Sequence, residues 1–295
     1  MPENLAHCPL CNLEGSSLFD QREFRGFQVT NRLCANCGFV YQSPRMTESE
    51  LIDFYQSQYR QIYQGIEGPD QKEIAIQEAR ALGIINLLRD CGVEQVKRFL
   101  DIGASTGMLI NKIKNEYQCD ASGIEPGRAY REYARSHGID VFASLDDLPD
   151  AGEKKFDLVS LIHVLEHIPD PVKYLEKVRS DYLVDQGRIL IEVPNIYAHD
   201  CFEIAHLTSF SRHTLNEVLK SAGFRTIFME AHGRPRSNMI PLYISFLAVP
   251  ELNTPDEPQI EVERWIRMKR NTGLAHRKLI EKLFPNQAWL PKYRS

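Results

Sequence analysis

From residue 96 onward the sequence alternates short apolar runs with helical stretches, and this alternation limits the fold more than any other feature. Seven runs have the length and composition of strands: 98–102, 121–124, 141–142, 158–162, 188–193, 226–229 and 242–249. Helical stretches separate the first five, which predicts a parallel sheet with helices on both faces. A polar turn, HGRPRSN, separates the last two. We therefore expect an α/β fold with a seven-stranded, mostly parallel sheet and an antiparallel hairpin at one edge.

The composition is that of an ordinary globular protein. Apolar residue types make up 43% of the chain and charged types 25%, which excludes wholesale disorder. The 35 basic and 40 acidic residues give a net charge of −5, which excludes a chain that is polybasic overall. The start of the sequence, MPENLAHCPLC, lacks the basic-then-apolar pattern of a signal peptide. We expect a soluble cytoplasmic protein without a transmembrane segment.

Four of the seven cysteines form two CxxC pairs near the N-terminus, Cys8 with Cys11 and Cys34 with Cys37. Two residues between the cysteines of a pair let both sulfurs face one ion, and two pairs supply the four ligands of a tetrahedral Zn²⁺ site. Gly38 suits the tight turn after the second pair. A redox pair is the alternative, but a redox CxxC is expected to open a helix after a strand. We predict a short, loop-rich zinc-binding segment in which the metal is structural.

Differences in composition divide the chain into four segments. We predict a zinc ribbon over 1–45, a helical connector or lid over 46–95, the α/β core over 96–250 and a basic helical tail over 251–295. In the connector, Thr47 is placed to cap one helix, and a second helix is expected over about 71–90. From Arg264 onward, nine Lys or Arg residues accompany a single acid. This tail is either a helix packed on the core with a solvated basic face or a surface for an anionic partner.

A turn of small residues, from Asp101 to Gly107, joins the first core strand to a helix. Small residues let a ligand approach the backbone, and the helix N-terminus offers free N–H groups. The turn lacks the glycine spacing of a dinucleotide fingerprint and the GK[ST] of a P-loop. It does match the nucleophile elbow of α/β-hydrolases, with Ser105 as nucleophile. Glu125 ends the next strand, where a carboxylate can accept both ribose hydroxyls of a bound nucleoside, and a hydrolase needs no acid there.

With these residues, the segment 96–249 resembles the class I S-adenosylmethionine-dependent methyltransferases, which have a Rossmann-like fold. Their motif I, an acid followed by h-G-x-G-x-G, is matched here with Ser105 in place of the middle glycine. The strings LEHIPDP and GRILIEVPN resemble the ends of the family's fourth and fifth strands. The resemblance implies S-adenosylmethionine as cofactor. It implies these contacts: Asp101, Ile162 and His163 with the methionine part, Gly103, Ala104, Ser105 and Gly107 through the backbone, Glu125 with ribose, and Ser144 and Leu145 with adenine.

Histidines supply the candidate catalytic groups. His163, Glu166 and His167 would share one face if their stretch is helical, and His206 follows later. Ubiquinone-pathway O-methyltransferases and small-RNA 2′-O-methyltransferases, which this stretch resembles, carry Glu-x-x-Glu-His and a downstream His, and some hold a divalent metal there. A hydroxyl acceptor must lose a proton during transfer. Three interpretations stay open for these four residues: a metal-free histidine base, a second divalent metal, or a structural role.

The cysteine segment followed by this core also resembles antibiotic-pathway sugar C-methyltransferases. Ala205 replaces the Glu that those enzymes carry before the histidine, which favours transfer to oxygen. We expect methyl transfer to a hydroxyl of a sugar, a glycan or another hydroxylated metabolite, and a phosphorylated acceptor would suit the basic tail. The alternatives are an RNA methyltransferase that uses the zinc segment and the tail, and a non-catalytic cofactor-binding module.

Overall fold

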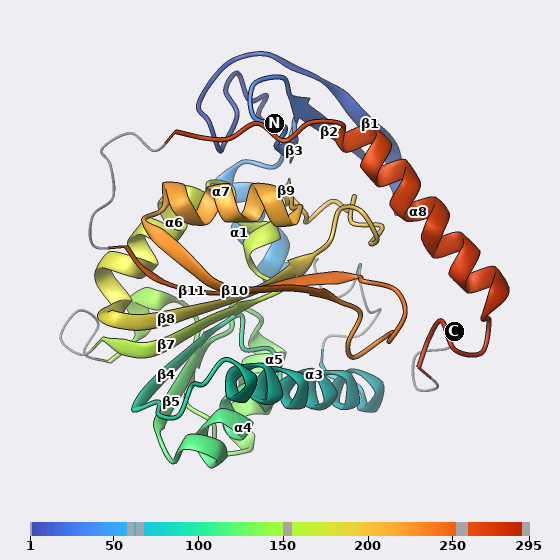
Figure 1. Ribbon diagram of the computed structural model, residues 1–295. Helices are drawn as coiled ribbons and strands as arrows, with labels where there is room; N and C mark the ends of the chain where they lie inside the picture. The colour runs from blue at the N-terminus through green and yellow to red at the C-terminus, as the bar shows by residue number, and fades with distance from the viewer. Residues whose placement is uncertain (1, 58–61, 63–67, 150–154, 252–258, 291–295) are drawn as a thin grey trace. The chain divides into compact units, whose positions relative to one another are not determined.

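The computed structural model describes residues 2–57, 62, 68–149, 155–251 and 259–290 (Figure 1). These residues form two compact units, each made of separate stretches of the chain. Unit 1 contains residues 1–51, 163–176 and 192–295, and unit 2 contains residues 52–162 and 177–191. Residues 252–258 and 291–295 of the predicted tail lie outside the described part of the chain.

The α/β prediction is confirmed by a seven-stranded sheet with the order β10-β11-β8-β7-β4-β5-β6 (Figure 1). Its strands are β4 (Arg98–Ile102), β5 (Asp120–Ile124), β6 (Val141–Phe142), β7 (Phe156–Ile162), β8 (Leu183–Pro194), β10 (Phe224–His232) and β11 (Tyr243–Pro250). β4 pairs in parallel with β5 and β7, and β5 pairs in parallel with β6. β10 and β11 form the expected antiparallel hairpin at one edge.

In unit 2, helices cover the strands with apolar faces. The helices are α3 (Gln71–Asp90), α4 (Met108–Tyr117) and α5 (Arg128–Ser136), with the short 3₁₀ turn η1 (Leu145–Asp147) and the π-turn η3 (Val178–Tyr182). α3 begins where the sequence predicts, because the Asp70 side chain accepts a hydrogen bond from the Glu73 N–H at 2.7 Å. Its buried residues recur at helical spacing, as in Ile84 and Leu88. Phe99 and Leu100 of β4 are fully buried and form part of the core.

The helix α1 (Glu48–Ser57) is capped as predicted. The Thr47 N–H donates to the Glu50 carboxylate at 2.9 Å, and the Glu50 N–H donates to the Thr47 hydroxyl at 3.4 Å. These two bonds satisfy N–H groups that have no partner within the helix. α6 (Pro171–Lys177), α7 (Arg212–Ser221) and α8 (Ile266–Leu283) complete the α-helices named in the described residues. None of those helices has the length and apolar character that crossing a membrane requires.

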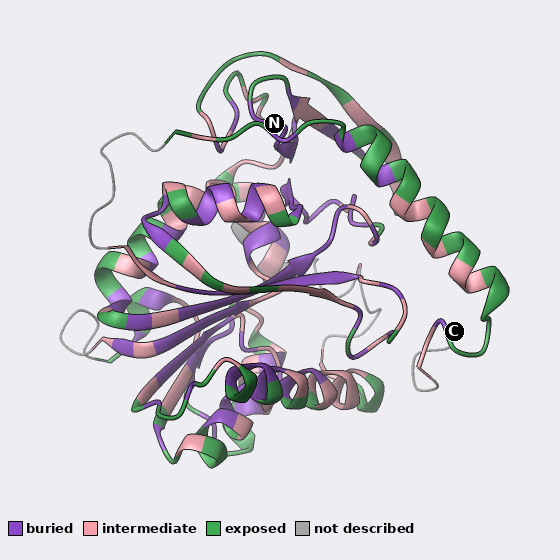
Figure 2. Ribbon diagram, viewed as in Figure 1, coloured by how far each residue is buried: buried purple, intermediate pink, exposed green. Residues whose placement is uncertain are grey.

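The N-terminal segment of unit 1 is richer in strands than its sequence predicts. It contains β1 (Ser16–Phe24), β2 (Phe27–Cys34) and β3 (Val40–Gln42). β1 and β2 form a hairpin whose two turn residues, Arg25 and Gly26, both have positive φ, as a type I′ turn requires. The expectation of a loop-rich segment was wrong because most side chains of β1 are at least partly exposed (Figure 2), so the strand has little apolar alternation.

A fourth strand completes this N-terminal sheet from a distant part of the sequence. β9 (Thr208–Ser209) pairs antiparallel with β3, and the sheet order is β1-β2-β3-β9 (Figure 1). The pairing is reinforced by the Gln42 N–H, which donates to the Leu207 carbonyl at 2.8 Å. The cysteine segment and the chain around His206 therefore share one small sheet within unit 1.

Candidate functional site

The four cysteines of the CxxC pairs form one cluster in unit 1. Their Sγ atoms all lie within 4.8 Å of one another. Sγ of Cys8 is 3.7 Å from Sγ of Cys37, and Sγ of Cys11 is 3.6 Å from Sγ of Cys34. Four sulfurs at about 2.3 Å from a tetrahedral Zn²⁺ would be about 3.8 Å apart, whereas a disulfide requires about 2.05 Å. The spacing of these sulfurs therefore fits a zinc-bound set.

Gly38 has the role that the sequence predicts in this cluster. Its φ is 82°, and its N–H donates to the Cys34 carbonyl at 3.2 Å to close the second turn. A Cβ at this position would lie 2.4 Å from the Glu263 carbonyl oxygen. Both the backbone conformation and the close approach exclude a side chain here.

The glycine-rich turn of unit 2 has the conformation of a ligand-binding loop. Gly103, Ser105 and Gly107 have φ values of 83°, 48° and 76°. A Cβ on Gly107 would lie 2.6 Å from Cδ1 of Ile139, so only glycine fits. Among the described residues, Ser105 Oγ and Thr106 Oγ1 are buried without a hydrogen-bond partner. No side chain in the described part of the chain accepts a hydrogen bond from Ser105 Oγ as a catalytic base would, which argues against a hydrolase, and the unpaired hydroxyls fit a polar ligand at the turn.

Glu125 connects the glycine-rich turn with the loop that follows β5. Its Oε2 accepts a hydrogen bond from the Ser105 N–H at 2.9 Å, and its Oε1 accepts one from the Gly127 N–H at 2.8 Å. The side chain is buried, so these charge-assisted bonds hold both loops in place. The carboxylate lies against the turn, as a ribose-binding residue must.

Asp101 is a second buried acid beside this turn. Ser160 Oγ donates to Asp101 Oδ1 at 2.6 Å. Burial raises the pKa of Asp101 to about 7, and the nearby charge of Glu125 acts in the same direction, while the bond from Ser160 opposes them. Two buried carboxyl groups favour a cationic ligand, and S-adenosylmethionine carries a sulfonium and an ammonium group.

The other predicted cofactor contacts in unit 2 lie at strand ends or next to them. Ile162 ends β7, and Ser144 and the buried Leu145 follow β6. The Ser144 N–H and hydroxyl both donate to the Asp147 carboxylate, at 3.0 and 2.8 Å. The carboxyl ends of parallel strands meet at one edge, where ligands bind in such sheets. The structure thus places these residues on the same edge as the glycine-rich turn.

The histidine segment of unit 1 does not form the expected helical face. His163 has a φ of 56°, and only the three-residue 3₁₀ turn η2 (Leu165–His167) follows it. The Glu166 carbonyl accepts a hydrogen bond from the Leu207 N–H at 2.8 Å, and the Leu165 carbonyl accepts one from Thr208 Oγ1 at 3.3 Å. Contacts with the chain around β9 therefore shape this turn, in place of helical periodicity.

His163 lies between two buried acids. Its Nδ1 is 3.3 Å from Glu166 Oε1, and its Nε2 is 3.2 Å from Glu192 Oε1. Glu192 Oε2 in turn lies 3.3 Å from His232 Nε2 and accepts a hydrogen bond from Ser245 Oγ at 3.1 Å. Both ring nitrogens of His163 are therefore occupied by contacts with carboxylate oxygens, so the geometry does not favour His163 as the base.

Two members of this network, Glu192 and His232, are not among the residues predicted from the sequence. Glu192 is an acid within the otherwise apolar run ILIEVP, and that contrast is the signal that could have drawn attention to it. His232 lies on β10 and has no comparable signal, because its contact with Glu192 depends on the pairing of strands.

Glu166, His167 and His206 come together, and their ligand atoms lie within 4.8 Å of one another. His167 Nδ1 lies 2.9 Å from the Ala205 carbonyl, and His206 Nδ1 lies 2.8 Å from the Cys201 carbonyl. A carbonyl oxygen only accepts hydrogen bonds, so both Nδ1 atoms carry a proton, and in the neutral form of each ring the lone pair is on Nε2.

The charge state of this group follows from its burial. Burial lowers the pKa of His167 to about 4, against the opposing charge of Glu166, so its ring is neutral at physiological pH. Burial alone would raise the pKa of Glu166, but the hydrogen-bonding contact with His163 and electrostatic interactions with the surrounding histidines lower it to about 2. Among the described residues, the Glu166 carboxylate has no hydrogen-bond partner besides its 3.3 Å contact with His163 Nδ1. An ionised carboxylate and two imidazole lone pairs can accept a proton or hold a divalent cation.

Comparisons with known proteins agree with this geometry. A family model described as a methyltransferase domain matches residues 76–227. The ubiquinone biosynthesis O-methyltransferase of Hahella chejuensis is 33% identical over 86 residues, covering 27% of this chain and 36% of that protein. The tRNA U34 carboxymethyltransferase of Campylobacter hominis is 30% identical over 122 residues, covering 39% of this chain and 42% of that protein. The chain thus spans less than half the length of these relatives.

A solved structure shows the same fold. The 1,6-didemethyltoxoflavin-N1-methyltransferase of Burkholderia thailandensis, with 1,6-didemethyltoxoflavin and S-adenosylhomocysteine bound, superposes with a TM-score of 0.55. The match covers 74% of this chain and 97% of that chain at 17% sequence identity. At this identity the likeness concerns the fold alone.

Proposed function

Because this chain belongs to the class I S-adenosylmethionine-dependent methyltransferases, we propose that it transfers the cofactor's methyl group to a hydroxyl of a sugar, a glycan or another hydroxylated metabolite. The observation that supports a hydroxyl acceptor is the group formed by Glu166, His167 and His206. A hydroxyl must lose its proton, whereas a neutral amine can attack the methyl group without prior deprotonation. The imidazole of His206, whose Nδ1 is held by the Cys201 carbonyl, can accept that proton at Nε2.

The reaction is an in-line displacement. The acceptor oxygen forms a bond to the methyl carbon, the carbon–sulfur bond breaks, and its electron pair stays on sulfur, which leaves S-adenosylhomocysteine. The hydroxyl proton passes to a histidine. We assign that role to Nε2 of His206, because burial lowers the pKa of His167 to about 4 and makes His167 a weak base. The bond between His206 Nδ1 and the Cys201 carbonyl keeps Nε2 in the accepting form.

A second candidate mechanism uses a divalent cation held by Glu166, His167 and His206. Both histidines have their Nδ1 bound to a backbone carbonyl, an arrangement typical of metal-binding imidazoles. Among the described residues, the buried Glu166 carboxylate has no hydrogen-bond partner besides its contact with His163. When bound, such a cation lowers the pKa of an acceptor hydroxyl. His163, the fourth residue considered from the sequence, falls outside this set because both of its nitrogens face carboxylates.

We assign the cofactor to unit 2 and a structural Zn²⁺ to the cysteine cluster. Glu125 is the proposed ribose ligand, Asp101 the partner of the methionine amino group, and the glycine-rich turn the surface for its backbone. Cys8, Cys11, Cys34 and Cys37 are the proposed zinc ligands, since their sulfurs have the spacing that the ion requires.

The proposal is tested by incubating the protein with methyl-labelled S-adenosylmethionine and separate pools of soluble metabolites, glycans and RNA. The expected product is a labelled methoxy group on a small molecule or glycan, located by mass spectrometry and NMR. Label on nitrogen or carbon would overturn the assignment to oxygen. Label that appears only in nuclease-sensitive material would favour the RNA alternative.

Glu125→Ala is expected to weaken cofactor binding by roughly 2–3 kcal/mol, because it removes a buried bidentate acceptor and both loop contacts. Isothermal titration calorimetry measures this loss. Glu132→Ala is the matched control, since Glu132 lies on α5 and pairs with the exposed Arg128. Unchanged affinity in a folded Glu125→Ala protein would refute the assigned pocket.

The raised pKa of Asp101 predicts that cofactor affinity depends on pH. Its pKa of about 7 means that the carboxyl is partly protonated near neutrality, and a cationic cofactor requires the ionised form. Cofactor affinity is therefore highest above this pKa. Below it, the affinity falls by about tenfold per pH unit, because the protonated Asp101 carboxyl must release its proton when the cofactor binds. Dissociation constants measured at about pH 6 and about pH 8 check this slope. Asp101→Asn should bind more weakly at high pH and lose the slope, and a slope that persists in that variant would assign it to another group.

A further inference from the structure

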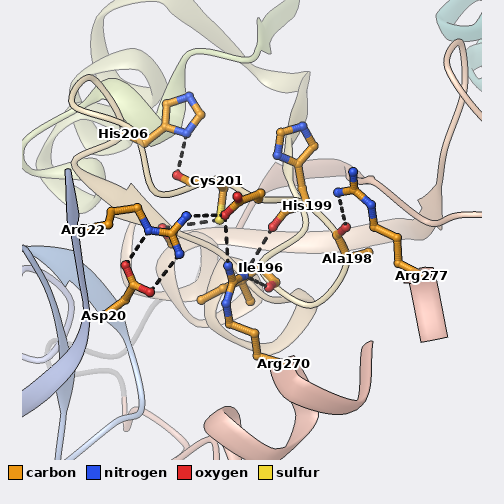
Figure 3. Close-up of polar contacts among 11 residues, drawn as sticks. Asp20, Arg22, Ile196, Ala198, His199, Cys201, His206, Arg270 and Arg277 are labelled. Atoms are coloured by element: carbon orange, nitrogen blue, oxygen red, sulfur yellow. Dashed lines mark hydrogen bonds and ion pairs between the residues drawn. The ribbon is translucent and has the colours of Figure 1, made fainter. Parts of the chain in front are cut away.

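The loop from Asn195 to His206 is held by arginines from segments outside the matched methyltransferase domain (Figure 3). Nη1 of Arg270, on α8, donates hydrogen bonds to the carbonyls of Ile196 and, at 3.3 Å, of His199. Nη1 of Arg277, two turns further along α8, donates to the Ala198 carbonyl at 3.1 Å. Two arginines of the basic tail thus form hydrogen bonds with the backbone of this loop.

The other side of the loop is held from the N-terminal hairpin. Nη1 of Arg22, on β1, donates to Asp200 Oδ1 at 2.7 Å, and Nη2 of Arg270 lies 3.5 Å from the same oxygen. The guanidinium groups of Arg22 and Arg270 also lie 5.2 and 4.2 Å from the centre of the Phe202 ring. Asp200 and Phe202, the two neighbours of Cys201, are therefore both fixed by arginines.

These arginine contacts fix the position of the Cys201 carbonyl. It accepts the hydrogen bond of His206 Nδ1 at 2.8 Å (Figure 3) and so keeps the lone pair on Nε2. If the Cys201 carbonyl were displaced, His206 Nδ1 would lose its hydrogen-bond acceptor, and the ring could adopt the tautomer with the proton on Nε2. The contacts run from Arg270 through the loop backbone to the imidazole, and all of these residues belong to unit 1.

We propose that Arg270 is a positioning residue for methyl transfer, which holds the loop so that the Cys201 carbonyl keeps His206 in its proton-accepting tautomer. The inference rests on the proposed function, because it concerns the histidine assigned there as base. Arginine suits this position, since its planar guanidinium donates in several directions and stacks on an aromatic ring, which a lysine ammonium cannot do. Its side chain is buried, with 5% of its surface exposed, so it does not offer a charge to an anionic partner.

Arg270→Ala and Arg270→Lys test the proposal, with Arg267→Ala as the matched control. Arg267 lies on the same helix, but its guanidinium donates to the Leu18 and Phe19 carbonyls of β1. For Arg270→Ala we expect kcat to fall on the order of 100-fold, as for a displaced catalytic group, with the dissociation constant of the cofactor unchanged. Arg270→Lys, which keeps the charge, should be intermediate, and Arg267→Ala should match the wild type.

A second measurement does not depend on activity. Nitrogen-15 NMR of labelled histidines reports the tautomer of His206 directly, and the wild type should show the proton on Nδ1. Arg270→Ala should show a mixture of tautomers. Wild-type kcat and tautomer in a folded Arg270→Ala protein would overturn the proposal, and so would an equal loss in Arg267→Ala. If the wild type methylates no hydroxyl but the tautomer still responds to Arg270, the proposed function fails and the positioning contact stands.

Discussion

His206→Ala is expected to lower kcat by roughly 10²–10⁴-fold while the dissociation constant of the cofactor stays unchanged. The variant removes the Nε2 lone pair that we assign as proton acceptor, whereas the proposed cofactor contacts lie in unit 2. Single-turnover kinetics with the identified acceptor, together with calorimetry for the cofactor, separates the two effects. His276→Ala is the control, because His276 is exposed on α8.

The same variant distinguishes the two mechanisms. If a divalent cation is held by Glu166, His167 and His206, His206→Ala will lose a metal equivalent beyond the one assigned to the cysteine cluster, and a chelator will inhibit the wild type. If His206 acts as a free base, the metal content will not change and the chelator will have no effect on turnover. A kcat within about twofold of the wild type would contradict both mechanisms.

Cys34→Ser is expected to release the zinc ion and to unfold the N-terminal sheet. A serine hydroxyl does not ionise near neutral pH and is a poor zinc ligand, and structural zinc sites contribute on the order of 10 kcal/mol to the folding of small segments. Cys34 ends β2, and β3 begins six residues later, so both strands depend on the cluster. Metal analysis should show loss of one equivalent, and limited proteolysis should show early cleavage within residues 1–45.

Activity is expected to fall in Cys34→Ser as well. Because β3 pairs with β9 and Gln42 binds the Leu207 carbonyl, loss of the N-terminal sheet frees the chain next to His206. Cys91→Ser is the control, since Cys91 lies at the end of α3, outside the cluster. A full metal complement in Cys34→Ser would contradict the zinc assignment, and full activity without metal would contradict the link to His206.

The two candidate sites differ in how much the sequence could predict. The residues around the cofactor turn lie at the ends of strands that are neighbours in a parallel sheet, so strand order and motif spacing are enough to bring Asp101 and Glu125 near each other. No comparable rule of strand order or motif spacing brings together the group of Glu166, His167 and His206. Its shared helical face was not formed, because the segment from Glu166 to His167 adapts to contacts with the chain around β9.

The contacts of the basic tail likewise could not be predicted from the sequence alone. Its charge suggests an anionic partner as readily as a packed helix, because composition does not tell which face of a helix carries a given arginine. In the structure, Arg267, Arg270 and Arg277 all donate to backbone carbonyls, although only Arg270 is buried. The structure shows that part of the tail is the helix α8 and that these three arginines hold backbone carbonyls, while an anionic partner for the tail stays a prediction.

The sequence alone determined the seven strands, the helix from Gln71 to Asp90 and the cysteine cluster, because apolar runs, caps and CxxC spacing are properties of short segments. Only the tertiary structure decided which groups surround His206. The contact of His167 with Ala205 joins residues 38 positions apart, and that of Arg270 with Ile196 joins residues 74 positions apart. Such contacts form only when separate elements pack together, so no local pattern in the sequence records them.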